Sequence, residues 1–122
     1  INRVVCRVGR IGGGFGGKET RNINISCAAA LAAHHLNRPV RLLLERDLDM
    51  GITGGRHPFH ATYKVGFTNE GKILGADLKL FSNGGISSDL SFPVLDRALL
   101  FCDGCYNIPN LRNEGRVCKT NL

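Results

Sequence analysis

The order of hydrophobic and polar positions predicts alternating strands and helices in the first third of the chain. Residues 3–8 (RVVCRV) are rich in β-branched side chains and predict a strand, which the following glycines should end. Residues 19–36 are rich in Ala and Leu and predict a helix that is buried on most sides. Residues 40–44 (VRLLL) predict a short buried strand. Together these segments predict a strand, Gly-rich loop, helix, strand unit of the βαβ kind.

Charged and polar residues mark both ends of this predicted helix. Glu19 near the N-terminus, and His34 and His35 near the C-terminus, suit the helix dipole. Asn37, followed closely by Pro39, is a plausible stop signal. The pattern therefore predicts a helix that ends at about residue 36.

The rest of the chain predicts a hairpin, a helix and one more strand. Residues 45–50 (ERDLDM) favour a turn or short helix before a glycine-rich loop. Hydrophobic and polar residues alternate on both sides of a turn at residues 69–71, which predicts a β-hairpin over residues 59–81. Residues 89–101 predict a helix, and the tail favours a strand around residues 115–118. Leucines 95, 99 and 100 are expected to face inward. The expected fold class is α/β, in the sense of a mixed α+β arrangement.

Composition limits the possible classes of protein. The chain has 122 residues, of which 43% are hydrophobic and 21% charged, as in a globular domain or a piece of one. It has no hydrophobic run near the roughly 18 residues that a membrane helix needs. The 16 basic and 10 acidic residues give a net charge of +6, but the basic residues are scattered, which disfavours a nucleic-acid partner. The sequence starts inside a hydrophobic run and lacks a closing signal, so we expect residues 1–122 to be a partial domain.

The cysteines and acidic residues give weak metal-site signals. The five cysteines have no regular spacing, which favours reduced, intracellular thiols. Cys102 and Cys105 form one C-x-x-C motif, and His57 and His60 could supply nitrogen ligands, but no second C-x-x-C supports a zinc site. The acidic pair in residues 45–50 lacks the spacing of a calcium loop, so solvated or arginine-paired carboxylates are preferred.

The most informative segment is the glycine loop at residues 12–20 (GGGFGGKET). Successive glycines let a ligand approach the backbone, and the helix that follows offers unpaired N–H groups. The loop fits G-x-G-x-x-G, but the acidic residue expected about 20 positions later is absent. It also fits the start of a P-loop, but Glu19 stands where a hydroxyl residue should bind magnesium. A nucleotide-binding module therefore remains only as an alternative.

Four sequence blocks together resemble the molybdenum hydroxylases, and within them the xanthine dehydrogenase/oxidase group. The blocks are residues 12–19 (GGGFGGKE), 45–50 (ERDLDM), 53–59 (TGGRHPF) and 118–122 (CKTNL). The resemblance covers essentially the whole chain and identifies it as a fragment of a molybdenum-cofactor-binding domain. It implies hydroxylation of hypoxanthine to xanthine and of xanthine to urate, in purine catabolism.

The resemblance assigns roles to four residues. It places the backbone of Phe15 at the molybdenum centre, with Gly16 beside it, and makes Glu19 and Arg97 substrate-binding residues. Aldehyde oxidases of the same family typically replace both charged side chains, so they are the less favoured alternative. The family's general-base glutamate lies beyond this chain, which implies that residues 1–122 alone are inactive.

The resemblance also implies cofactors and partners. The domain would bind molybdenum-molybdopterin, and the full-length enzyme would also carry two 2Fe-2S iron-sulfur clusters, FAD and NAD. None of the cysteines here matches an iron-sulfur pattern. The resemblance further implies a homodimer that acts on a small purine, without nucleic acid or membrane, in the cytoplasm or, alternatively, the peroxisome.

Overall fold

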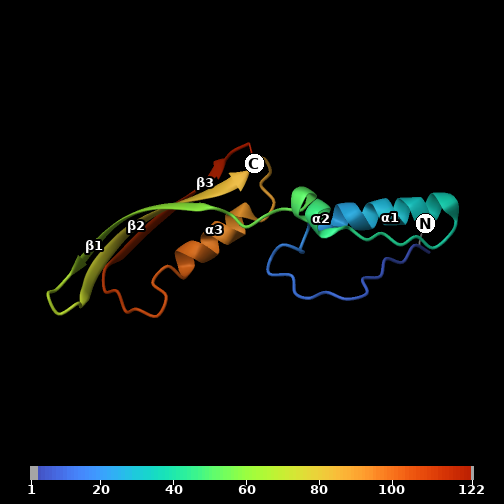
Figure 1. Cartoon of the computed structure of the whole chain (residues 1–122). Helices are drawn as coiled ribbons and strands as arrows, with labels where there is room; N and C mark the ends of the chain where they lie inside the picture. Colours follow the sequence, from blue (N-terminus) through green and yellow to red (C-terminus); the bar gives the residue numbers. More distant parts are fainter. Residues whose placement is uncertain (1–2, 122) are drawn as a thin grey trace. The chain divides into compact units, whose positions relative to one another are not determined.

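The computed structural model describes residues 3–121, which divide into two compact units at residues 56 and 57 (Figure 1). The first unit holds two helices, α1 (Asn22–Leu36) and α2 (Arg46–Ile52). The second holds, in chain order, β1 (Phe59–Phe67), β2 (Ile73–Gly85), α3 (Ser91–Leu100) and β3 (Leu111–Lys119). The mixed α+β class expected from the sequence is therefore confirmed.

Helix α1 ends as the sequence predicts but begins later. Its last turn contains His34 and His35, and it is capped by Asn37 in the left-handed conformation (φ 50°). It begins at Asn22, and its first turn contains no acidic residue, so the expected dipole role of Glu19 is wrong. The expected burial is also wrong, because no residue of α1 is buried against the rest of the described chain.

The two strands predicted on either side of α1 are absent from the described residues. Residues 4–10 and 39–45 have no assigned strand or helix, and Val5 and Leu43 are each 72% exposed. A strand needs a neighbouring strand to satisfy its backbone N–H and C=O groups. No sheet forms in the first unit as described, so β-branched composition alone did not produce the predicted βαβ unit there.

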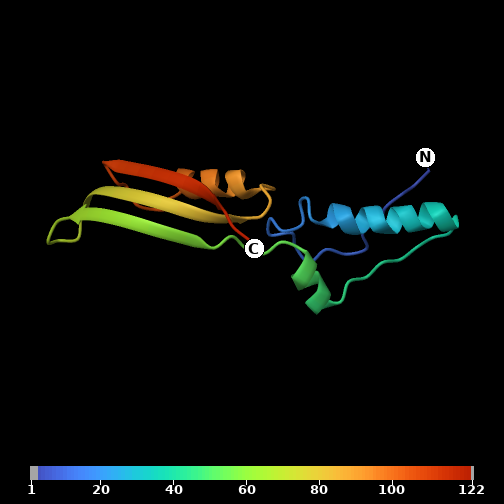
Figure 2. The same cartoon turned by 90° about the horizontal axis from the view of Figure 1, so that it is seen from above.

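The second unit is built on a three-stranded sheet in the order β1-β2-β3 (Figure 2). Strands β1 and β2 form the predicted antiparallel hairpin, and Gly71 in its turn has a φ of 85°. Strand β3 is longer than predicted and lies parallel to β2, which the sequence did not indicate. Because α3 connects these parallel strands, β2, α3 and β3 form a βαβ unit.

Helix α3 packs against β2 and β3 through a small set of side chains. Leu95 is 5% exposed, and Leu99 is half-buried beside Gly115 of β3. A Cβ atom at Gly115 would lie only 2.8 Å from Cδ1 of both leucines, so the helix sits directly on the strand backbone. Leu100 is 73% exposed, so its expected inward direction is wrong.

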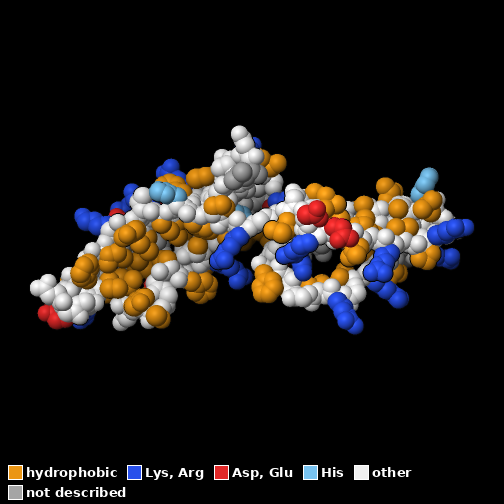
Figure 3. All heavy atoms as spheres, viewed as in Figure 1, with side chains coloured by type: hydrophobic (Ala, Val, Ile, Leu, Met, Phe, Trp, Pro, Cys, Tyr) orange, Lys and Arg blue, Asp and Glu red, His pale blue; other side chains and the backbone are white. Residues whose placement is uncertain are grey.

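Strand β1 carries hydrophobic side chains that remain exposed. In the register of the hairpin, alternate β1 residues share the sheet face that α3 covers over β2 and β3. Nothing in the described chain covers them, and Tyr63 and Phe67 are 76% and 68% exposed. Figure 3 shows hydrophobic side chains gathered on the surface of this unit. The expected buried face of β1 is therefore not buried within this chain.

Candidate functional site

The glycine loop contains a tight turn at residues 14–17. The Gly17 N–H donates to the Gly14 carbonyl at 2.9 Å, and the two central residues, Phe15 and Gly16, have φ values of 49° and 80°. Two successive positive φ angles are the sign pattern of a type I′ turn. Gly16 adopts this conformation without strain, whereas a phenylalanine there costs on the order of 1–3 kcal/mol. Such strain in a loop points to a functional constraint on Phe15.

The backbone before this turn also requires glycine. Gly13 has a φ of 121°, and a Cβ atom there would clash with Cε2 of Phe15. The Phe15 ring therefore lies over the Gly13 backbone while remaining 97% exposed. A substitution at Gly13 would strain the backbone and displace the ring.

The loop has backbone donors available for a cofactor. Among the described residues, neither the Phe15 amide nor the Gly16 amide donates to another group of the chain. A Cβ atom at Gly16 would meet no atom of the described residues within 4 Å, so the Gly16 backbone is open to close approach. Exposed N–H groups on a strained glycine turn are suited to an anionic or oxygen-rich group, and the pyranopterin and oxo groups of a molybdenum cofactor have that chemistry. The loop therefore fits the expected cofactor.

The two predicted substrate-binding residues lie in different units. Glu19 is exposed in the bend between the glycine loop and α1 of the first unit. Arg97 is exposed in the last turn of α3 in the second unit, as the helix prediction required. Phe15, Gly16 and Glu19 lie in one loop segment of the first unit, whereas Arg97 belongs to the second unit.

Arg97 projects from the side of α3 that faces away from the sheet. Leu95 and Leu99, two residues before and after it, pack over Gly115. Positions two apart on a helix are separated by about 200°, so Arg97 lies nearly opposite both leucines. The Arg97 side chain therefore projects from one face of α3, while Leu95 and Leu99 on the opposite face pack against β3.

The N-terminal end of α3 is held by a hydrogen-bond chain. His57 Nε2 lies 2.9 Å from the hydroxyl of Ser91, the first residue of α3. The Ser91 hydroxyl donates to the Gly84 carbonyl at 3.3 Å, so it accepts from His57 Nε2–H. Ser91 is 1% exposed, so these bonds replace water at a buried polar group.

The C-terminal end of α3 is held by β3. Asn113 Nδ2 donates to the Leu99 carbonyl at 2.8 Å and to Cys102 Sγ at 3.0 Å. The last carbonyls of a helix lack partners within the helix, and this side chain supplies one. Sequence reasoning missed Asn113 and Ser91 and considered His57 only as a metal ligand, because these contacts join residues distant in sequence.

The structure also describes the cysteines and acidic residues that were considered as metal ligands. No group of three or more His, Cys, Asp or Glu side chains could hold a metal ion in the described part of the chain. All five cysteines there are free. Asp49 lies 3.5 Å from Arg46 Nη1, in keeping with an arginine-paired carboxylate.

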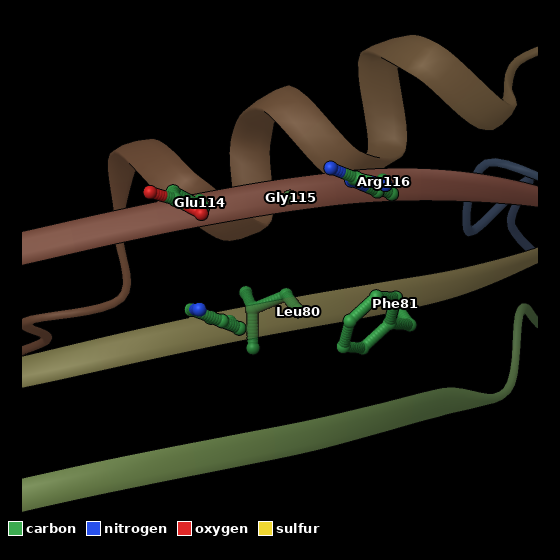
Figure 4. Close-up of a pocket in the computed structure, with 6 residues that line it drawn as sticks. Leu80, Phe81, Glu114, Gly115 and Arg116 are labelled. Atoms are coloured by element: carbon green, nitrogen blue, oxygen red, sulfur yellow. The ribbon is translucent and has the colours of Figure 1, made fainter.

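A shallow hollow between β2 and β3 contains none of the predicted site residues. It has a volume of about 150 Å³ and is lined by Lys79, Leu80, Phe81, Glu114, Gly115 and Arg116 (Figure 4). Pockets for cofactors and ligands usually occupy about 300–1,000 Å³. The glycine loop and α3 are therefore better candidates for function than this hollow.

Comparison with known proteins identifies what the chain resembles. The molybdopterin cofactor-binding domain family matches residues 1–122. The chain is 59% identical over 121 residues to xanthine dehydrogenase/oxidase of Rattus norvegicus, and 56% identical over 121 residues to xanthine dehydrogenase of Dictyostelium discoideum. It is 58% identical over 122 residues to xanthine dehydrogenase 1 of Arabidopsis thaliana. These alignments cover 99–100% of this chain but 9% of each relative. No helix in the described residues has the length and hydrophobicity needed to cross a membrane.

Proposed function

We propose, on the premise that this chain belongs to the molybdopterin cofactor-binding domain family, that it forms part of the purine site of a molybdenum-dependent hydroxylase. The observation that carries the proposal is the strained glycine turn, with Phe15 at φ 49° and Glu19 four residues later. The relatives named xanthine dehydrogenase support a purine substrate. The proposed reactions convert hypoxanthine to xanthine and xanthine to urate.

The backbone of Phe15 and Gly16 would hold the molybdenum cofactor. Their amides are available, and the absence of a Cβ atom at Gly16 leaves room for close approach. When bound, the cofactor would supply the two-electron oxidation that hydroxylates a purine ring carbon. The residues of this chain would place the cofactor and the purine without acting as the general base.

Glu19 and Arg97 would bind and orient the purine. The Glu19 carboxylate can accept from a ring N–H, and its protonated form can donate to a ring nitrogen or carbonyl oxygen. Arg97 offers a planar cationic fork to oxygen or nitrogen acceptors. Negative charge develops on the purine during hydroxylation, so a fixed cation stabilises the transition state more than the ground state.

The proposal can be tested by comparing the activity of the full-length protein on xanthine with its activity on an aldehyde. Arg97→Met should lower kcat/KM on xanthine by about 10²–10³-fold, the usual effect of removing one preorganised group that stabilises developing charge. Turnover of a simple aldehyde should change far less, because an aldehyde has no purine nitrogens for Arg97 to contact. Arg116→Met, at an exposed arginine of β3, is the matched control.

Two results would count against the proposal. Equal losses on xanthine and the aldehyde would remove the purine-orienting role of Arg97. Wild-type protein that oxidises aldehydes but not purines would favour the aldehyde oxidase alternative. The other expected groups, namely two 2Fe-2S clusters, FAD, NAD and a second subunit, would belong to regions of the full-length protein beyond residues 1–122.

A further inference from the structure

Helix α3 is fixed at both ends by side chains that take no part in the proposed purine site. At the N-terminal end, His57 reaches from the segment before β1 to Ser91, across 34 positions of sequence. At the C-terminal end, Asn113 of β3 donates to the Leu99 carbonyl at 2.8 Å. Between them, Leu95 and Leu99 rest on Gly115.

These contacts define the position of the Arg97 backbone. Ser91 and Arg97 are six residues apart, or about 9 Å along the helix axis. Arg97 itself is exposed, and no ion pair or hydrogen bond holds its side chain to the described chain. The position of the Arg97 Cα atom therefore depends on the position of α3. The position of α3 depends in turn on the contacts made by His57 and Asn113 at its two ends.

We propose that His57 is a positioning residue for Arg97, acting through Ser91 at the N-terminal end of α3, with Asn113 holding the opposite end. This inference rests on the proposed function, because positioning matters only if Arg97 contacts the purine. The His57 bond spans two separate elements and involves a hydroxyl that is 1% exposed. Loss of His57 leaves this buried hydroxyl without its donor, which favours movement of the helix end.

The experiment is a double-mutant cycle in the full-length protein, with xanthine and an aldehyde as substrates. His57→Ala should lower kcat/KM on xanthine by about 10–100-fold, as expected for a displacement near 1 Å, and should largely spare the aldehyde. The loss should lie mainly in kcat, since Arg97 acts on charge that develops in the transition state. In the Arg97→Met background, His57→Ala should cause no further selective loss.

Three variants keep the interpretation specific. His57→Gln retains a side-chain N–H donor and should restore much of the xanthine activity. His60→Ala removes an exposed histidine on β1 and should leave both substrates unaffected. Asn113→Asp removes the donor at the other end of α3 and should reproduce the selective loss, so the inference does not depend on one variant.

The outcomes separate this inference from the proposed function. Selective loss of xanthine activity in Arg97→Met, without it in His57→Ala, would overturn the positioning role alone. Equal losses on both substrates in His57→Ala, or additive losses in the double variant, would also overturn it. No selective loss in Arg97→Met would overturn the proposed function, and with it the reason for positioning.

Discussion

Gly115 offers a way to move α3 without altering any polar group. Gly115→Ala would place a Cβ atom 2.8 Å from Cδ1 of both Leu95 and Leu99, and 3.1 Å from Cγ of Leu95. Carbon atoms in good contact lie about 3.5–4.0 Å apart, so the leucines must withdraw by roughly 1 Å. Leu95 is 5% exposed and has little room to rotate. Such overpacking typically costs about 1–3 kcal/mol.

Arg97 lies between these two leucines in sequence and on the opposite face of the same helix, so it should move when the helix moves. We expect Gly115→Ala in the full-length protein to lower kcat/KM on xanthine by about 10–100-fold while largely sparing an aldehyde. Gly66→Ala is the matched control, since Gly66 lies in the same sheet and an added Cβ atom there meets no atom within 4 Å. Steady-state kinetics on both substrates and thermal denaturation provide the assay. Unchanged xanthine kinetics, despite a lowered Tm, would refute the link between α3 packing and Arg97.

Two further predictions concern the glycine loop and the sheet. Gly16→Ala should lower the free energy of unfolding by about 1–2 kcal/mol, because an L side chain is strained at φ 80°. The same variant should lower the molybdenum content of the full-length protein. Gly12→Ala is the control, because its added Cβ atom also meets open space, and it should leave the molybdenum content unchanged. Equal molybdenum content in both variants would contradict the cofactor role. The Arg112 guanidinium lowers the pKa of Glu114 in the folded protein. The interaction of Glu114 with Arg112 therefore stabilises the folded protein at pH values above the pKa of Glu114 in the unfolded chain. This stabilisation is lost as the pH falls through the lower pKa of Glu114 in the folded protein. The Tm difference between wild type and Glu114→Gln should shrink on acidification, and a constant difference would exclude this linkage.

The local elements could be predicted wherever sequence pattern and neighbouring contacts agree. The hairpin of residues 59–81 has alternating side chains and a turn with Gly71 at positive φ, so both signals favour one structure. The Ala-rich helix α1 has high intrinsic helix propensity, ends at Leu36 and is capped by Asn37. The strands predicted at residues 3–8 and 40–44 are absent, because strand formation depends on a pairing partner that composition does not reveal.

The candidate site could be predicted only in part, for a similar reason. The glycine loop is local, so the sequence indicates its unusual backbone, although not the strain at Phe15. The parallel pairing of β2 with β3, and the close fit of α3 on Gly115, depend on residues far apart in the chain. The contacts of His57 and Asn113 with the two ends of α3 could not be predicted from the sequence, because each joins residues that are distant in the chain.

A crystal structure of the full-length protein with a bound purine would test the central claim most directly. We predict that the Glu19 carboxylate and the Arg97 guanidinium lie at hydrogen-bond distance from the purine, about 2.7–3.2 Å. We also predict that the backbone of Phe15 and Gly16 lies against the molybdenum cofactor. A purine bound at the molybdenum centre with neither Glu19 nor Arg97 in contact would contradict the account.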